Sequence, residues 1–298
     1  MRQLRERSLV GLECLEAVTA LLQRRRAAHP TAGLFEAADL QWWWSQNERA
    51  TDDMPQLFWF DDDRRPQAAV IATAFGGGVQ LDPMLMPDAG DDLKALVMGR
   101  GLANAHLHGH DAVTMEVDPA DAALADVLAG LGLAIEEDSM VEAWLTAAAR
   151  PPISSLPPGY RLCSRAESGH RPHHMISALR QHPDPEPRMR QTSLYRDDLD
   201  LVVFDHDGNV AAYGLFWNDP ATATGLVEPM RTEADHQQRG LARHVLTTGI
   251  SLLAAAGASR IKICFDPDNA ASKHLYLSVG FQPVLRTVMY AGLTSGPA

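Results

Sequence analysis

The feature that most constrains this chain is the turn at residues 236–243, between a strand-like run at residues 226–230 and a helix-like run. After the turn, Leu241 and Val245 recur at helical spacing, so the turn opens an amphipathic helix. Gly240 has no side chain to block the approach of a ligand to the backbone, and the first N–H groups of a helix lack partners within it. The sequence therefore predicts a cradle for an anionic group such as a pyrophosphate.

Two arginines strengthen this interpretation. Arg239 and Arg243 add full positive charges to the partial positive charge at the start of the helix. The pattern Gln237-x-x-Gly240-x-Ala242 resembles the pyrophosphate loop of the GNAT family of N-acetyltransferases. The resemblance implies acetyl-CoA as a cosubstrate and no metal. The cofactor-binding residues that it implies are Met230, Arg231, Thr232, Gln237, Gln238, Arg239, Gly240, Leu241, Ala242, Arg243, Asn269 and Ser272.

A second stretch resembles the last strand and the last helix of the same family. Residues 261–265 have strand character, Asn269 begins an Asn-Ala-Ala run, and Tyr276 and a terminal Gly280-Phe281 pair follow. Both stretches occur in the family's order. Together they extend the resemblance over about residues 160–293.

Composition and charge exclude several classes of protein. The net charge is −12: residues 1–150 hold 24 acidic and 12 basic residues, and residues 151–298 hold 14 of each. An acidic half disfavours nucleic acid as a partner. No run approaches the ~18 apolar residues of a membrane span, and the first thirty residues fit an amphipathic helix rather than a signal peptide. Three scattered cysteines favour a cytoplasmic location, and the oligomeric state is left open.

Hydrophobic periodicity and turn residues divide the chain into two similar series of elements. In the first half we expect helices over residues 9–27, 34–44, 91–107 and 119–131, and strands over residues 56–60, 68–75, 79–85, 112–117 and 140–145. In the second half we expect strands over residues 160–165, 199–204, 210–217, 225–230, 260–265 and 284–290, and helical regions around residues 175–181, from 241 and over 269–279. The proline-rich residues 151–159 predict a stiff linker.

The two halves repeat one pattern. Asp118 matches Asp266 at an offset of 148 residues, and the same offset aligns Gly132 with Gly280. We therefore predict an α/β (α+β) protein of two tandem GNAT modules, each a mixed and mostly antiparallel sheet flanked by helices. Residues 1–150 would form a degenerate module, residues 151–159 the linker and residues 160–298 the catalytic module.

The first half is expected to lack an active site. The offset of 148 places Asp92 at the position of Gly240 and Leu128 at the position of Tyr276. A carboxylate at the mouth of a phosphate cradle repels a pyrophosphate. We therefore expect this half to be structural or to shape the substrate site.

Two side chains of the second half are candidates for catalysis. Strand alternation places Glu228, Met230 and Thr232 on one face, and the resemblance implies a base at Glu228. It also implies that Tyr276 donates a proton to the departing thiolate, while a backbone N–H near Thr232 polarises the thioester carbonyl. Structural alternatives stay open, because Glu228 could equally be a surface or ion-paired residue and Tyr276 a packed one. Asn269 could cap its helix as well as contact the pantetheine arm.

Two groups of histidines and one cysteine could also carry chemistry. The first group is His106, His108 and His110, the second is His170, His173, His174 and His182, and the cysteine is Cys264. The first group has no cysteine nearby and fits a solvated loop better than a metal site. The second group precedes a proline-rich break where the family shapes its acceptor pocket; surface helix residues are the simpler interpretation, and substrate binding is the alternative. The cysteine lies in an apolar strand, where thiols are usually inert.

These features together predict an acetyl-CoA-dependent N-acetyltransferase that acts on the amine of a small molecule by direct attack. Two other functions stay open. A non-catalytic acyl-CoA-binding or regulatory module would keep Gln237 and Gly240 but release no thiol with any amine. A protein N-acetyltransferase would need a long open groove. The acceptor itself cannot be identified, because residues 165–200, which would bind it, match no motif.

Overall fold

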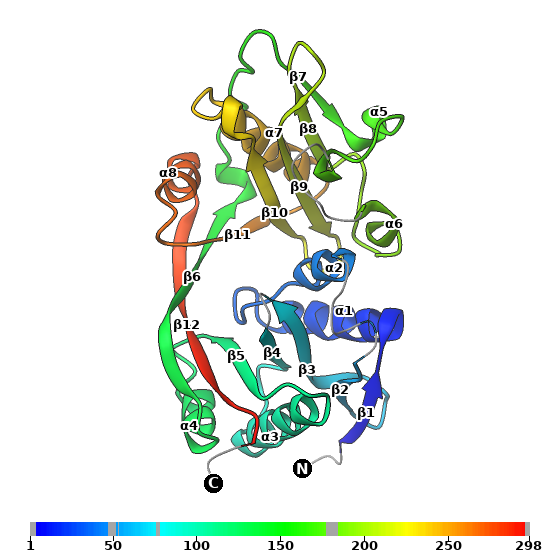
Figure 1. Ribbon diagram of the computed structural model, residues 1–298, viewed down its shortest axis with the longest axis vertical. Coiled ribbons are helices and arrows are strands. Elements are labelled where there is room, and N and C mark those ends of the chain that lie inside the picture. Colours follow the sequence, from blue (N-terminus) through cyan, green and yellow to red (C-terminus); the bar gives the residue numbers. More distant parts are fainter. Residues whose placement is uncertain (1–3, 47–51, 53, 76–77, 177–183, 296–298) are drawn as a thin grey trace. The chain divides into compact units, whose positions relative to one another are not determined.

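The computed structural model describes residues 4–46, 52, 54–75, 78–176 and 184–295. The chain forms two compact units, each a sheet flanked by helices (Figure 1). The first unit holds Met1–Leu40, Glu48–Met140 and Leu285–Ala298, and the second holds Gln41–Asn47 and Val141–Val284. The predicted α/β class is confirmed. Across the described ranges, no helix is both long enough and apolar enough to cross a bilayer.

The sheet of the first unit has the strand order β1-β2-β3-β4-β5-β12. Its strands are β1 (Arg5–Leu9), β2 (Gln56–Phe60), β3 (Pro66–Phe75), β4 (Gly78–Leu85), β5 (Ala112–Val117) and β12 (Gln282–Leu293). Its helices are α1 (Gly11–Ala28), α2 (Ala37–Ser45), α3 (Asp91–Leu107) and α4 (Ala122–Gly130). Within the described residues of this sheet, β4 pairs with β5 in parallel and the other strand pairs are antiparallel. Helices α1 and α3 pack on β3 and β4.

The sheet of the second unit has the order β6-β11-β10-β9-β8-β7. Its strands are the second half of β6 (Ala134–Thr146, of which residues 134–140 fall in the first unit), β7 (Arg161–Ser164), β8 (Asp200–Phe204), β9 (Val210–Asp219), β10 (Thr224–Thr232) and β11 (Arg260–Phe265). Its helical elements are η1 (Ala147–Ala149), α5 (Arg165–Ser168), η2 (His174–Ile176), α6 (Glu186–Met189), η3 (Ala234–His236), α7 (Leu241–Ala255) and α8 (Ala270–Val279). α7 packs on β8, β9 and β10, where its apolar stripe of Leu241, Val245 and Ile250 closes the core.

The order of elements repeats along the chain, as predicted. β5 and β11 begin at Ala112 and Arg260, and α4 and α8 begin at Ala122 and Ala270, which is the expected offset of 148 residues in both cases. β6 and β12 share that offset as well. The predicted helical region at residues 175–181 lies largely outside the described residues, which show only η2 there.

The last strand of each half is exchanged. β6 ends the first half, yet it pairs with β11 of the second unit, with Val141 opposite Phe265. β12 ends the second half, yet it pairs with β5 of the first unit, with Val288 opposite Val117. The compact units therefore differ from the division at residues 150 and 160 that the sequence predicts, because strand partners are not encoded in local patterns.

Part of α2 also belongs to the second unit. The buried Gln41 side chain accepts a hydrogen bond from the backbone N–H of Leu194 at 2.8 Å and donates one to Ser193 Oγ at 2.9 Å. Trp44 contributes its carbonyl to Arg188 Nε, 2.7 Å away, and the Arg188 guanidinium stacks over the indole at 4.0 Å. The first half thus supplies a fixed support for the segment that precedes β8.

Candidate active site

The candidate site lies where two parallel strands separate. β10 pairs with β11 only from Thr224 to Leu226. On its other edge β10 pairs with β9, and a register shift between Val227 and Met230 gives β10 one extra residue. Such a bulge bends a strand and increases its twist. Residues 227–232 therefore run beside β9 without β11 as a neighbour.

The register shift changes which side chains share a face. Val227 belongs to the core beneath α7, and Met230 packs against the same core. The predicted alternation, with Glu228, Met230 and Thr232 on one face, is therefore wrong, because it assumed an unbroken strand.

Glu228 and Tyr276 act on each other electrostatically although they lie far apart in sequence. Tyr276, on α8, is buried against Phe265 and Phe281, with ring centroids 5.7 and 6.3 Å away. Burial raises the pKa of Tyr276 to about 12, and the negative charge of Glu228 adds to the effect. The Glu228 carbonyl accepts a hydrogen bond from Trp217 Nε1 at 2.8 Å, which fixes the strand at this residue.

The turn before α7 has the geometry of an anion cradle. Gly240 is the N-cap of α7, with a φ of +83° that favours glycine. A Cβ atom at Gly240 would meet nothing within 4 Å, so the space in front of the turn is open. Among the described residues, no acceptor is recorded for the backbone N–H groups of Leu241, Ala242 and Arg243. Three donors at the positive end of a helix dipole are therefore available to an anion.

Side chains around the cradle hold it in place. Gln237 Nε2 donates to the Thr232 carbonyl at 3.4 Å, so this side chain folds back on the end of β10. Gln238, in the same turn, has a left-handed backbone conformation with a φ of +59°. Arg243 donates to Ser278 Oγ, which ties α7 to α8. The Thr232 hydroxyl is buried and makes no hydrogen bond within the described part of the chain.

Asn269 caps α8, as one of the two sequence hypotheses expects. Its Oδ1 atom accepts a hydrogen bond from the Ser272 N–H at 3.1 Å, and Ser272 Oγ donates to the Asn269 carbonyl at 3.0 Å. An N-cap of this kind satisfies a donor that the first turn would otherwise leave open. The role of either residue toward a pantetheine arm stays a prediction.

The first unit has a counterpart of the cradle, in a different register from the one predicted. α3 begins at Asp91 with Gly90 as its N-cap. Gly90, not Asp92, therefore occupies the position in the first unit that is equivalent to Gly240. From the start of α3 to the start of β5 the chain advances 21 residues, whereas from the start of α7 to the start of β11 it advances 19, so an offset taken from later elements is two residues too small here. Asp91 and Asp92 form the first turn of α3, where two carboxylates oppose an anionic ligand.

The first unit also has a counterpart of Glu228. β4 pairs in parallel with β5 as far as Gln80, and Asp82 follows two residues later, just as Glu228 follows Leu226. Asp82 is fully buried, and its Oδ1 accepts a hydrogen bond from Gln80 Nε2 at 2.8 Å. Burial, with smaller contributions from Glu116 and Asp39, raises the pKa of Asp82 to about 7.

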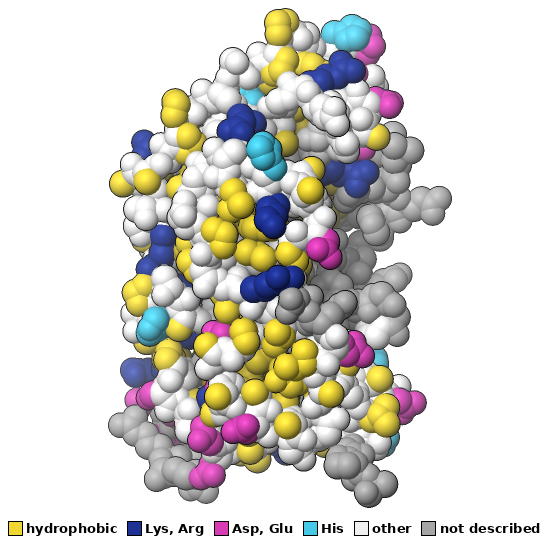
Figure 2. All heavy atoms as spheres, turned by 90° about the vertical axis from the view of Figure 1, so that its left-hand side faces the viewer, with side chains coloured by type: hydrophobic (Ala, Val, Ile, Leu, Met, Phe, Trp, Pro, Cys, Tyr) yellow, Lys and Arg dark blue, Asp and Glu magenta, His cyan; other side chains and the backbone are white. Residues whose placement is uncertain are grey.

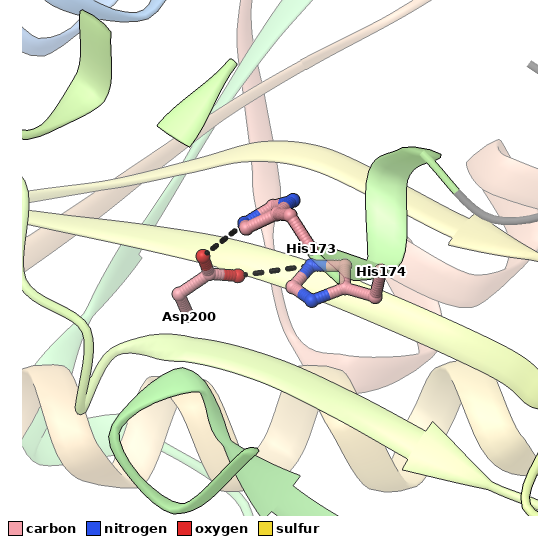
Figure 3. A group of neighbouring side chains, drawn as sticks. All are labelled: His173, His174 and Asp200. Carbon is pink, nitrogen blue, oxygen red and sulfur yellow. Dashed lines mark hydrogen bonds and ion pairs between the residues drawn. The ribbon is translucent and has the colours of Figure 1, made fainter. Parts of the chain in front are cut away.

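Two histidines expected at the surface are buried instead. His173 Nε2 lies 2.9 Å from Asp200 Oδ2, and His174 Nε2 lies 3.0 Å from Asp200 Oδ1 (Figure 3). Tyr195 donates to Asp200 Oδ2 at 2.9 Å. Although burial opposes the ionisation of Asp200, the two imidazoles outweigh it and hold the pKa of Asp200 below its usual value. The network ties the segment before β8 to the sheet. His182 lies outside the described residues, and His170 is exposed.

This cluster suits a hydrogen-bond network better than a metal site. Its donor atoms lie within 4.8 Å of one another. However, His173 Nδ1 accepts a hydrogen bond from the Met175 N–H at 3.3 Å, so Nε2 carries the proton and donates to Asp200. A metal ligand needs the lone pair of that same nitrogen.

Surface charge differs between the two halves of the chain. Residues 1–150 carry the whole net charge of −12, and residues 151–298 are neutral overall. Figure 2 shows Lys and Arg side chains gathered on the visible face of the second unit and mostly acidic ones on that of the first. Long-range attraction for a polyanion therefore favours the second unit.

Comparison with known proteins shows what this part of the chain resembles. Residues 169–281 match the Acetyltransferase (GNAT) family. The match covers 113 of the 298 residues. The match includes the cradle, Glu228 and Tyr276.

The chain is also similar to two curated proteins. The mycothiol acetyltransferase of Beutenbergia cavernae is 29% identical over 104 residues, which is 35% of this chain and 35% of that protein. The mycothiol acetyltransferase of Tsukamurella paurometabola is 35% identical over 81 residues, or 26% and 28% of the two chains. The chain thus spans about a third of the length of the curated relatives it matches.

Solved structures extend the likeness to both units. A tandem GNAT protein from the clavulanic acid biosynthesis pathway has a TM-score of 0.70 and 15% identity, with 99% of this chain and 100% of that chain covered. A GCN5-related N-acetyltransferase from Sphaerobacter thermophilus has a TM-score of 0.59 and 15% identity, with 99% and 96% covered. The predicted tandem GNAT fold is confirmed.

Proposed function

We propose that this protein is an acetyl-CoA-dependent N-acetyltransferase with one active site, in the GNAT domain, acting on the amine of a small molecule. The main supporting observation is the open turn at the start of α7, where Gly240 has a φ of +83° and a Cβ atom would meet nothing within 4 Å. Similarity to two mycothiol acetyltransferases supports acetyl transfer, and the tandem plan with a degenerate first half resembles that of mycothiol synthase. Because Asp91 and Asp92 oppose an anion, the first unit would bind no acetyl-CoA.

In this mechanism the amine nitrogen attacks the thioester carbonyl carbon. The C–N bond forms, the C–S bond breaks, and the sulfur leaves as a thiolate. The cradle would hold the pyrophosphate, so that the acetyl group lies near the separation of β10 and β11. Glu228 would take the proton of the amine directly or through water, and Tyr276 would give a proton to the thiolate.

Burial keeps the proton on Tyr276 until the thiolate forms. With a pKa of about 12, Tyr276 keeps its proton at neutral pH but holds it more tightly than a free tyrosine. Part of this effect comes from the charge of Glu228.

Replacement of Tyr276 by Phe is expected to lower kcat ~10²-fold, the usual size of a lost general acid. Only the phenolic O–H is removed, so the packing against Phe265 and Phe281 stays and the affinity for acetyl-CoA should not change. Steady-state kinetics and calorimetry measure the two quantities. The matched control is Tyr290→Phe, because Tyr290 is also buried but belongs to the first unit, away from the proposed site. Equal rates in Tyr276→Phe and in the control would exclude Tyr276 as the acid.

Replacement of Glu228 by Gln is expected to remove the acidic limb of the pH–rate profile. In the wild type, kcat should fall at low pH because a protonated carboxylate cannot accept the proton of the amine. The Gln variant should be slow at all pH values and should lack this limb. If the limb persists in the variant, the amine binds already neutral and Glu228 is not the base.

A further inference from the structure

The proline-rich residues 151–159, predicted to be a stiff linker, lie along α7. The Ser154 N–H donates to Thr247 Oγ1 at 3.1 Å, and the Ser154 carbonyl accepts from His244 Nδ1 at 2.5 Å. His244 and Thr247 are buried residues of α7. Leu156 packs against the core beneath the helix. The segment is therefore fixed to the helix that begins at the phosphate cradle.

Tyr160 directly follows this segment, beside the cradle. Gly159 has a φ of +86°, which turns the chain into β7 and delivers the Tyr160 side chain. Arg239 Nη1 donates to the Tyr160 hydroxyl at 3.2 Å, and the same hydroxyl lies 3.0 Å from His236 Nδ1. The ring of Tyr160 meets that of His236 edge to face, with centroids 5.7 Å apart. Tyr160 thus joins two residues of the turn that precedes α7.

These contacts orient the Arg239 guanidinium before any ligand binds. Its Nη2 atom donates to the Asp235 carbonyl at 3.0 Å, so two of its five N–H donors are used and the others remain for a phosphate. A free arginine side chain at the surface carries considerable rotamer entropy, which binding would have to remove. A guanidinium that is already held loses less entropy when the pyrophosphate arrives.

We propose that Tyr160 is a positioning residue for acetyl-CoA, which holds Arg239 at the mouth of the cradle. The inference rests on the proposed function. Tyr160 lies outside residues 169–281, which match the family, and outside the site predicted from sequence. It also gives the proline-rich segment a role, because that segment sets where Tyr160 lies relative to α7.

Tyr160→Phe tests the inference, since it removes the hydroxyl and keeps the ring. The Kd and KM of acetyl-CoA should rise about 5-fold, the effect of one hydrogen bond of ordinary strength, with kcat unchanged. S-acetylpantetheine, which has no pyrophosphate, should react equally well with the wild type and the variant. A variant that was merely less stable would lose activity with both donors.

Arg239→Ala, alone and combined with Tyr160→Phe, completes a double-mutant cycle. If Tyr160 acts through Arg239, the two losses of affinity should not add, and the double variant should resemble Arg239→Ala. Additive losses, or an unchanged acetyl-CoA affinity in Tyr160→Phe, would overturn the inference. If the wild type itself fails to bind acetyl-CoA, the proposed function fails, and the two failures are thereby distinguished.

Discussion

Gly240→Asp is expected to abolish acetyl-CoA binding while the protein stays folded. A Cβ atom at this position meets nothing within 4 Å, so the substitution causes no clash. The φ of +83° adds a backbone cost of roughly 1–2 kcal/mol, which a domain of this size tolerates. The new carboxylate would face the pyrophosphate, and two like charges ~4 Å apart near a protein surface repel by ~4 kcal/mol, or about 10³-fold in affinity.

Two control variants isolate this effect. Gly257→Asp places the same residue at the other end of α7, where φ is +98° and a Cβ atom also meets nothing within 4 Å. It should bind acetyl-CoA normally. Gly240→Asn adds similar bulk without charge and should lose less affinity than Gly240→Asp. Calorimetry should give one acetyl-CoA per chain for the wild type, and an unchanged affinity in Gly240→Asp would exclude the phosphate cradle.

Asp82→Asn is expected to raise the free energy of unfolding at pH 8 by about 4 kcal/mol. Asp82 Oδ2 is buried and has no hydrogen-bond partner in the described part of the chain. Its charge is therefore costly in the folded state, which is why its pKa rises from 3.8 to about 7. Each unit of pKa difference corresponds to about 1.4 kcal/mol.

The sign of the pH dependence follows from the raised pKa. The folded protein keeps the proton of Asp82 up to about pH 7, whereas the unfolded chain releases it near pH 4. The stability that this proton contributes is complete below pH 4 and is lost as the pH rises to 7. Asn cannot ionise, so urea unfolding at pH 5 and pH 8 should show a smaller decline in the variant. Asp88→Asn, at an exposed position, is the control, and parallel curves for Asp82→Asn and the wild type would contradict the prediction.

Much of the fold can be predicted because the hydrophobic pattern is local. The predicted ranges of α3, β2, β5 and β11 agree with the structure to the residue. β1 is missed, because its sequence is mostly charged and four of its five residues are exposed. The exchange of β6 and β12 is missed because a strand's pattern shows that it is buried but not which strand lies beside it.

The sequence likewise predicts the parts of the candidate site that depend on local motifs, and misses those that depend on contacts between distant residues. The cradle and Tyr276 are predicted from short motifs, and their roles stay predictions. Asp92 is assigned to the position of Gly240 because one offset cannot represent a stretch, from the start of the helix to the start of the next strand, that differs by two residues between the halves. The burial of His173 and His174, and the contact of Tyr160 with Arg239, depend on residues distant in sequence and leave no local signal.

The most direct test of the proposed function is the release of coenzyme A thiol from acetyl-CoA with a panel of amines. The panel includes amino acids, aminoglycosides and the acceptor of the mycothiol acetyltransferases. The proposal predicts release that requires one amine, equals the amount of amide formed, and is lost in Gly240→Asp. If the wild type binds acetyl-CoA but releases no thiol with any amine, catalysis is contradicted and an acyl-CoA-binding module is favoured.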